Sequence, residues 1–211
     1  MFGIVGYWSF VLSAVLLNMT PGSDTIYVLT RSAVGGRNAG IVSALGISGG
    51  ILVHTVLASF GLSVILAQSP LAFNIVKYAG AAYLVFLGIK AIISKKPLFS
   101  DNGEAANASP FALFRQGMLT NLLNPKLALF FLALLPQFVA PDNTYGALPF
   151  LLLGLTFFTT STIWSLFLAF IASFASKLLQ KNEKVSRAAG KVSGIIYIIL
   201  GLNVLRAKIG A

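Results

Sequence analysis

Six long apolar segments make up most of this chain, and they constrain its fold more than any other feature. They lie at roughly residues 7–28, 41–67, 71–94, 117–139, 147–174 and 189–207. Each is close to the length of about 20 residues that a helix needs to cross roughly 30 Å of hydrocarbon. Backbone polar groups in hydrocarbon must be paired within the protein, which favours helices. The pattern therefore predicts an all-α protein that crosses a membrane six times.

The charged residues are too few for a sizeable soluble domain. Only 9% of the residues are charged and 57% are hydrophobic, so we expect one transmembrane domain over residues 1–211. The net charge of +10 lies in short loops and not in a basic patch with aromatic platforms, which argues against nucleic acid as a partner. Cysteine is absent, which excludes disulfides and cysteine metal sites. No metal is expected.

Lysine and arginine gather on one side of the predicted spans. That side holds Arg31, Arg37, Lys95, Lys96, Arg115, Lys177, Lys181, Lys184, Arg187 and Lys191, whereas the other holds Lys77, Arg206 and Lys208. Because cytoplasmic loops carry the excess of basic residues, the first side should face the cytoplasm. With six spans, both termini would then be periplasmic.

A polar stretch at about 95–114 divides the chain into two halves, about 1–94 and 115–207, and reads as a cytoplasmic linker. The halves share features: Pro21 corresponds to Pro125, Gly46 to Gly154, and Gly88 to Gly201. Each half holds three predicted spans, an odd number, so the second half would cross the membrane in the opposite sense. The sequence therefore predicts two inverted three-helix repeats, an arrangement common in secondary transporters.

Two polar interruptions lie at matching places in the first and fourth spans. The first contains Asn18, Thr20, Pro21, Gly22 and Asp24, and the second contains Asn121, Asn124, Pro125 and Lys126. Proline removes a backbone donor, and a charge in hydrocarbon is costly, so both spans should be broken helices. A broken helix exposes N–H groups at one end and carbonyls at the other, which suits a zwitterion such as an amino acid.

Asp24 and Lys126 are the formal charges predicted to lie inside the membrane. Asp24 is seven residues from Arg31, hence about 10 Å inside the span at 1.5 Å per residue. Lys126 is deeper and needs a carboxylate or the carbonyls of a helix break, so we expect the two to pair. Asp24 could exchange protons, bind substrate, or cap the helix that restarts after Gly22, and the pair could be a static brace.

A second motif, Gly46-Ile47-Ser48-Gly49-Gly50 followed by His54, fits the G-x-S-x-G pattern of serine hydrolases. Six residues of helix would place Ser48 and His54 about 9 Å apart along the axis and about 120° apart around it, which precludes a hydrogen bond. We expect Gly46 and Gly50 to form a close-packing face instead. His54 leaves a proton relay and a hydrogen bond to a neighbouring helix open. Threonine hydroxyls of the fifth span are expected to bond their own backbone: Thr156, Thr159, Thr160 and Thr162.

Six short runs occur in order along the chain: Thr20-Pro21-Gly22-Ser23-Asp24-Thr25, Gly36-Arg37-Asn38-Ala39-Gly40, Leu52-Val53-His54-Thr55, Ala79-Gly80-Ala81-Ala82-Tyr83-Leu84, Asn124-Pro125-Lys126 and Leu135-Pro136-Gln137-Phe138. Together they resemble the LysE/RhtB family of bacterial amino-acid exporters, most of all its homoserine/threonine/homoserine-lactone efflux branch. The resemblance implies a multi-pass exporter of the bacterial inner (plasma) membrane, driven by the proton-motive force without a cofactor. Ser23 departs from the pattern, because relatives often have a second proline there.

We therefore predict a secondary active exporter of homoserine- or threonine-like neutral amino acids, coupled to proton influx by alternating access. It would not be an enzyme; a passive amino-acid channel and an intramembrane serine hydrolase are the alternatives. Its partners would be an amino-acid substrate and the lipid bilayer, and a homodimer is left open. The residues predicted to bind substrate or couple protons are Asp24, Lys126, Asn124, Pro125, Pro21, Gly22, Thr20, Asn18 and His54.

Overall fold

The computed structural model describes residues 2–68, 70–93 and 108–181, with single positions at 191, 195, 198, 199 and 202. These ranges are helical apart from short connections, and the extended pairing found within them is one bridge between Ile4 and Val139. The predicted all-α class is confirmed. Much of the predicted linker, 95–107, and most of the predicted sixth span, 189–207, lie outside the described residues.

Several described helices suit a membrane. Gly35–Gly61 and Leu148–Ala172 are each long and apolar enough to cross one, and the pair Pro110–Leu122 and Lys126–Phe138, bent by 51°, meets the same criterion if the two helices form one span. Tyr7–Met19 is a shorter apolar helix. The chain is therefore a helical membrane protein, and the count of six spans stays a prediction.

The first span is broken where the sequence predicts it. Helix α1 (Tyr7–Met19) ends before Thr20, and α2 (Ser23–Gln68) begins after Pro21 and Gly22. Thr20 has extended backbone angles, φ −75° and ψ 115°, as expected for a residue that precedes proline. The break thus follows from local backbone chemistry.

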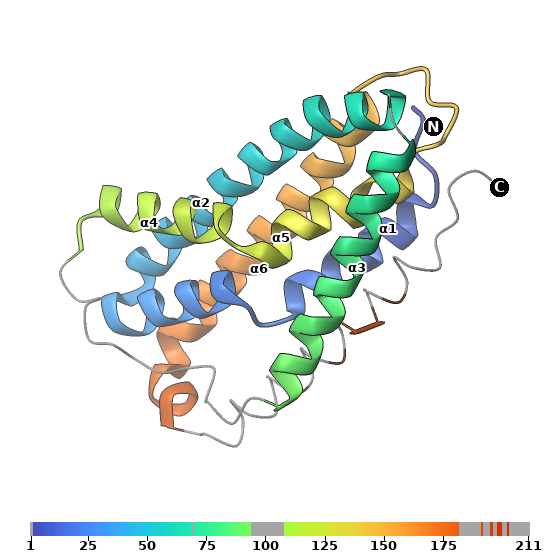
Figure 1. The fold of residues 1–211 in the computed structure, drawn as a ribbon. Helices are drawn as coiled ribbons and strands as arrows, with labels where there is room; N and C mark the ends of the chain where they lie inside the picture. The colour runs from blue at the N-terminus through green and yellow to red at the C-terminus, as the bar shows by residue number, and fades with distance from the viewer. Residues whose placement is uncertain are drawn as a thin grey trace.

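Helix α2 reverses direction at Gly36, whose backbone angles, φ 79° and ψ −178°, favour glycine. A Cβ on Gly40 would lie 2.6 Å from the Ser32 side chain, whereas eight residues of straight helix would separate these positions by about 12 Å. Figure 1 shows the ribbon turning back there. The prediction that Arg31 and Arg37 lie in a loop is wrong: both are helical, because one glycine is enough to make the turn.

The remaining helices are α3 (Pro70–Ile93), α4 (Pro110–Leu122), α5 (Pro125–Leu129), the π-helix η1 (Phe130–Leu134), the 3₁₀-helix η2 (Leu135–Phe138) and α6 (Leu148–Lys181). Helix α4 begins earlier than predicted, because the Ser109 side chain accepts a hydrogen bond from the Ala112 N–H at 3.3 Å and caps it. The linker predicted at 95–114 therefore ends before Pro110. The second break falls at Leu123 and Asn124, as the sequence predicts.

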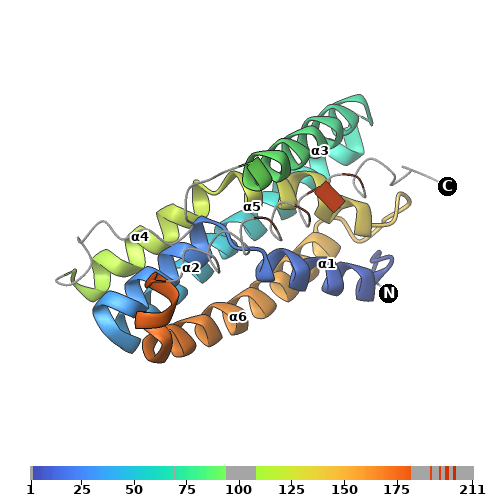
Figure 2. The ribbon, with the colours of Figure 1, turned by 90° about the horizontal axis from the view of Figure 1, so that it is seen from below.

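Glycines let α2 pack closely against α4 on one side and α6 on the other (Figure 2). A Cβ on Gly46 would collide with the Phe114 carbonyl, and one on Gly50 would lie 2.5 Å from Asn121 Oδ1. Towards α6, a Cβ on Gly154 would meet the Thr55 side chain. The predicted close-packing face of Gly46 and Gly50 is thus confirmed, and it brings α4 against the middle of α2.

Replacing Gly46 by alanine is expected to destabilise the protein by about 1–3 kcal/mol, the usual cost of overpacking. The obstructing atom belongs to the backbone of Phe114 and cannot turn aside. Thermal unfolding in detergent would measure the change. The control is Gly61→Ala on the same helix, since a Cβ there meets nothing within 4 Å. Equal unfolding temperatures for the two variants would contradict the close contact.

The two broken spans run antiparallel. The start of the chain bonds to the end of the second broken span, with Val5 N–H donating to the Phe138 carbonyl at 2.9 Å. At the other end of the bundle, the Tyr27 hydroxyl of α2 donates to the Leu113 carbonyl of α4 at 2.8 Å. Because each span begins where the other ends, their two breaks meet near the middle.

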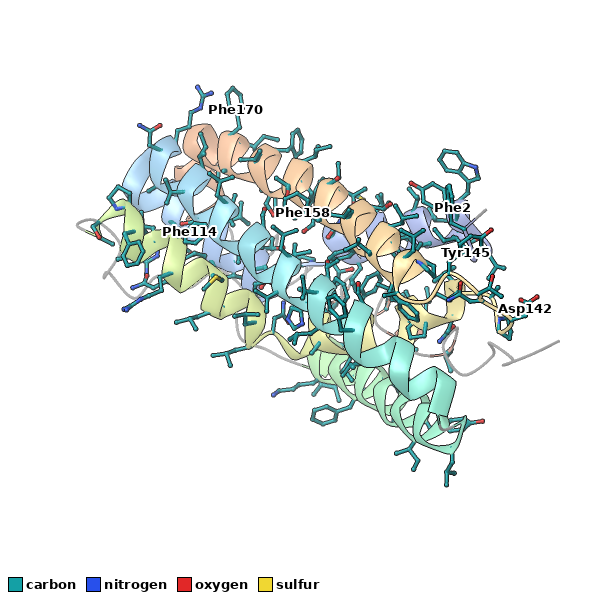
Figure 3. The ribbon with its side chains drawn as sticks, turned by 90° about the horizontal axis from the view of Figure 1, so that it is seen from above. Phe2, Phe114, Asp142, Tyr145, Phe158 and Phe170 are labelled. Atoms are coloured by element: carbon teal, nitrogen blue, oxygen red, sulfur yellow. The ribbon has the colours of Figure 1, made fainter. Side chains whose placement is uncertain are left out.

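The bundle therefore has two distinguishable ends. We call the end with Arg31, Arg37 and Arg115 the basic end, and the one with Ile4, Val139 and Asp142 the opposite end. Figure 3 shows Phe114 and Phe170 towards the first and Phe2, Tyr145 and Asp142 towards the second. The Arg37 guanidinium lies 4.7 Å from the centre of the Phe170 ring, which fixes its place at the basic end.

Candidate functional site

The Asp24 carboxylate of the first break is held by amides of the second. Asn121 Nδ2 donates to Oδ2 at 2.7 Å, and Asn124 Nδ2 donates to Oδ1 at 3.0 Å. The neighbouring Ser23 hydroxyl adds a bond to Oδ1 at 3.3 Å. These bonds come from side chains, and the two amides cross from the other break. The geometry therefore favours a role for Asp24 between the broken spans over the capping of its own helix.

Lys126 of the second break is held by carbonyls of the first. Its Nζ donates to the Leu17 carbonyl at 3.1 Å and to the Thr20 carbonyl at 3.0 Å. These groups lie at the C-terminal end of α1, where a cation is stabilised by the helix dipole. Lys126 is buried, and its charge also attracts that of Asp24. Each charge is thus held by hydrogen bonds to the opposite break, and a direct ion pair between Asp24 and Lys126 stays a prediction.

Asn124 joins the two charges. Its Oδ1 accepts a hydrogen bond from the Lys126 backbone N–H at 3.0 Å and caps α5, while its Nδ2 donates to Asp24. Its backbone is extended, with φ −76° and ψ 105°, again as expected before a proline. Pro125 fits the first position of α5, where a missing N–H costs nothing. The Asn-Pro pair therefore shapes the second break and positions Lys126.

Asn121 lies in the predicted second interruption, but sequence reasoning did not assign it to the site. It is fully buried, its amide donates to Asp24, and its Oδ1 has no hydrogen-bond partner within the described ranges. A single asparagine in an apolar helix does not by itself indicate a functional site. The available signal was its spacing: Asn121 precedes Asn124 by three residues, which places both on the same side of a helical turn.

His54 approaches the site through Asn121. Its Nε2 lies 3.4 Å from the Asn121 backbone carbonyl, and its ring stacks on Phe131 with centres 5.6 Å apart. The predicted hydrogen bond to a neighbouring helix is thus present, and a proton relay stays a prediction. Ser48 bonds Thr162 Oγ1 at 2.8 Å and the Ala44 carbonyl at 3.0 Å. The arrangement gives no support to a Ser48–His54 dyad.

Asn18 points elsewhere. Its Nδ2 donates to Thr160 Oγ1 of α6 at 3.3 Å, so its side chain joins α1 to α6 and does not bond to either charge. Thr156, Thr159 and Thr160 each donate to a backbone carbonyl of their own helix, as predicted. Thr20 also donates its hydroxyl within α1, to the Leu16 carbonyl at 2.7 Å. Its contribution to the site is its backbone carbonyl.

The arrangement can exchange partners with a zwitterion. An incoming ammonium can replace the amide donors on Asp24, and an incoming carboxylate can draw Lys126 from its carbonyls. A proton on Asp24 would cancel its charge and weaken both attractions. Among the described residues, no group of three or more His, Cys, Asp or Glu side chains could hold a metal ion.

Comparison with known proteins gives relatives along almost the whole chain. The profile of the family described as LysE type translocator matches residues 15–208. The chain is 34% identical over 203 residues to "Uncharacterized membrane protein YrhP" of Bacillus subtilis (strain 168), covering 92% of this chain and 96% of that protein. It is 28% identical over 200 residues to "Leucine efflux protein" of Salmonella typhimurium (strain LT2), covering 93% of each. It is 29% identical over 201 residues to the protein of that name from Enterobacter sp. (strain 638), again covering 93% of each. No solved structure gives a significant match.

Proposed function

This chain belongs to the LysE type translocator family, and on that premise we propose that it exports neutral amino acids from the cytoplasm in exchange for protons. It is a multi-pass bacterial membrane protein and an amino-acid exporter, not an enzyme. The observation that carries the proposal is the reciprocal bonding of the two breaks. Asp24 is held by Asn121 and Asn124, while Lys126 is held by the carbonyls of Leu17 and Thr20.

The cargo we propose is a neutral amino acid with an apolar side chain. Two relatives are named leucine efflux proteins, which supports leucine as the first substrate to test. The homoserine- or threonine-like cargo that the sequence pattern predicts is the second. A neutral side chain leaves the ammonium and the carboxylate as the groups that the two breaks must recognise.

The mechanism we propose is alternating access. The substrate ammonium replaces amide donors on Asp24. The substrate carboxylate replaces the α1 carbonyls as the hydrogen-bond partner of Lys126. A proton arriving from outside then neutralises Asp24, which releases the ammonium to that side. Return of the proton to the cytoplasm lets Asp24 recover its amide partners. No cofactor is required, because the proton gradient supplies the energy.

The orientation we propose puts the basic end in the cytoplasm, in keeping with the excess of Lys and Arg there, and the N-terminus outside the inner membrane. The antiparallel broken spans support two inverted repeats, and so do the lengths of α1 and α4, 13 residues each. The periplasmic C-terminus lies outside the described residues and stays a prediction. A homodimer also stays open.

Purified protein in lipid vesicles would test the proposal. Labelled leucine, threonine or homoserine would be loaded on the side of the basic end, with the opposite side made more acidic. We expect leucine to leave against its own gradient and to stop doing so when an uncoupler removes the proton gradient. Protein-free vesicles are the control. Export that an uncoupler does not affect would favour a passive channel, and loss of activity in a folded Ser48→Ala variant would favour a hydrolase.

A further inference from the structure

Arg31 at the basic end has a guanidinium that is only partly satisfied. Its Nη2 donates to Gln116 Oε1 of α4 at 3.0 Å, and its Cζ lies 5.3 Å from the centre of the Tyr27 ring. Its Nη1 is buried and has no hydrogen-bond partner in the part of the chain that the structure describes. A buried donor of a charged group is costly to leave unpaired. Arg31 Nη1 therefore needs a hydrogen-bond acceptor.

The carboxylates in the described ranges do not supply that acceptor. They are Asp24, which is bonded to Asn121 and Asn124, and Asp142, which lies at the opposite end. The Tyr27 hydroxyl donates to the Leu113 carbonyl. The other three carboxylates, Asp101, Glu104 and Glu183, lie outside the described residues and enter the test below.

Arg31 lies on the same helix face as Asp24. The two are seven residues apart, which is two turns or about 10 Å along the axis, with Tyr27 between them. All three side chains bond to α4: Asp24 to Asn121, Tyr27 to Leu113, and Arg31 to Gln116. The contact between α2 and α4 thus leads from the basic end to the charged breaks.

We propose that Arg31 Nη1 binds the carboxylate of the amino acid at the cytoplasmic side, before the substrate reaches Asp24. A guanidinium suits a carboxylate, since its planar N–H groups match the two oxygens. Holding the carboxylate at the basic end leaves the ammonium facing inward, towards Asp24. The substrate then binds Arg31 first and Asp24 second. The inference rests on the proposed function, because it assigns a part of the path to the same substrate.

The test compares leucine with leucinamide, which keeps the ammonium and lacks the carboxylate. In Arg31→Gln vesicles we expect the KM for leucine to rise by about 10- to 100-fold, as for the loss of one charged hydrogen bond. The response to leucinamide should not change, so the preference for leucine over leucinamide should fall. Arg31→Lys keeps the charge without the planar N–H pair, so its KM for leucine should lie between those of the wild type and Arg31→Gln.

Arg37→Gln is the matched control, since Arg37 lies at the same end and stacks on Phe170. It should keep the wild-type preference for leucine. An unchanged preference in Arg31→Gln would overturn the proposal. So would the same loss of preference in Asp101→Asn/Glu104→Gln/Glu183→Gln, since Arg31 would then be paired with one of these carboxylates and not with substrate.

Direct binding separates this inference from the proposed function. Thermal stabilisation of detergent-solubilised protein by leucine and by leucinamide requires no transport. A leucine-specific stabilisation that Arg31→Gln loses and Arg37→Gln keeps supports Arg31 even if the vesicles show no proton-coupled export. Equal stabilisation of the wild type by leucine and leucinamide overturns the Arg31 inference while leaving export itself intact.

Discussion

Replacing Asp24 by asparagine is expected to abolish export against a gradient while leaving the protein folded. Asparagine has nearly the same shape, and its Oδ1 can still accept a hydrogen bond from the Asn124 amide. Its Nδ2 can donate to the Asn121 Oδ1 once that amide turns over, but asparagine cannot take up a proton. If Asp24 carries the proton, uphill export should fall by about 100-fold or more, the order of effect that follows removal of a proton-transfer group. The accumulation ratio of leucine across vesicles with an imposed pH gradient would measure it.

The matched control is Asp142→Asn, the same substitution at an exposed carboxylate of the opposite end. It should leave the accumulation ratio unchanged. Uphill export by Asp24→Asn with the rate and pH dependence of the wild type would rule out Asp24 as the coupling carboxylate. Asp24 would then bind substrate or brace Lys126.

Replacing Lys126 by methionine is expected to destabilise the folded protein by about 3–5 kcal/mol, the usual cost of leaving a buried charge without a compensating opposite charge. Two effects contribute. The carbonyls of Leu17 and Thr20 lose a donor, and Asp24 keeps a charge that is no longer balanced. Denaturant or thermal unfolding in detergent would give the loss, and export should be lost with it. Lys90→Met, an exposed lysine on α3, should unfold like the wild type.

The double variant Asp24→Asn/Lys126→Met measures how strongly the two charges depend on each other. Removing both should recover part of the stability that Lys126→Met loses, because the unbalanced carboxylate is gone. A double variant no more stable than Lys126→Met would mean that Lys126 stabilises the fold through the α1 carbonyls alone. The static-brace alternative predicts full recovery of folding, with export limited only by the amount of folded protein.

The fold was largely predictable because membrane helices follow from apolar length. The breaks were predictable because Pro21 and Pro125 are incompatible with a continuous hydrogen-bonded helix. Two helix boundaries were not predictable in this way. Hydropathy falls at Arg31 and Arg37, but helical turns continue up to Gly36 and resume directly after it, since helix hydrogen bonds are internal and do not depend on side-chain polarity. In the same way α4 extends back to Pro110, where the Ser109 cap starts it.

The site was predictable only as far as its charges. Asp24 and Lys126 stand out because ions are rare in hydrocarbon. Their partners depend on how the two breaks lie against each other, which a single sequence does not reveal. Asn121 was not assigned to the site for that reason, since its role comes from the hydrogen bond it donates to Asp24 across the interface. Asn18 was included because of its place in the first break, but the rotation of α1 turns it to Thr160.

The backbone hydrogen bonds at the opposite end have a mechanical consequence. Val5 N–H donates to the Phe138 carbonyl, and Ala140 N–H donates to the Gly3 carbonyl, at 2.9 and 2.8 Å. These two hydrogen bonds join the segment before α1 to the end of η2. The two segments therefore move together, although they belong to different halves of the sequence. If these two bonds hold while the basic end opens, the joined segments move together and the bending falls on residues 20–22 and 123–124. The pivots would then lie beside Asp24 and Lys126, where a proton or a substrate can act on them directly.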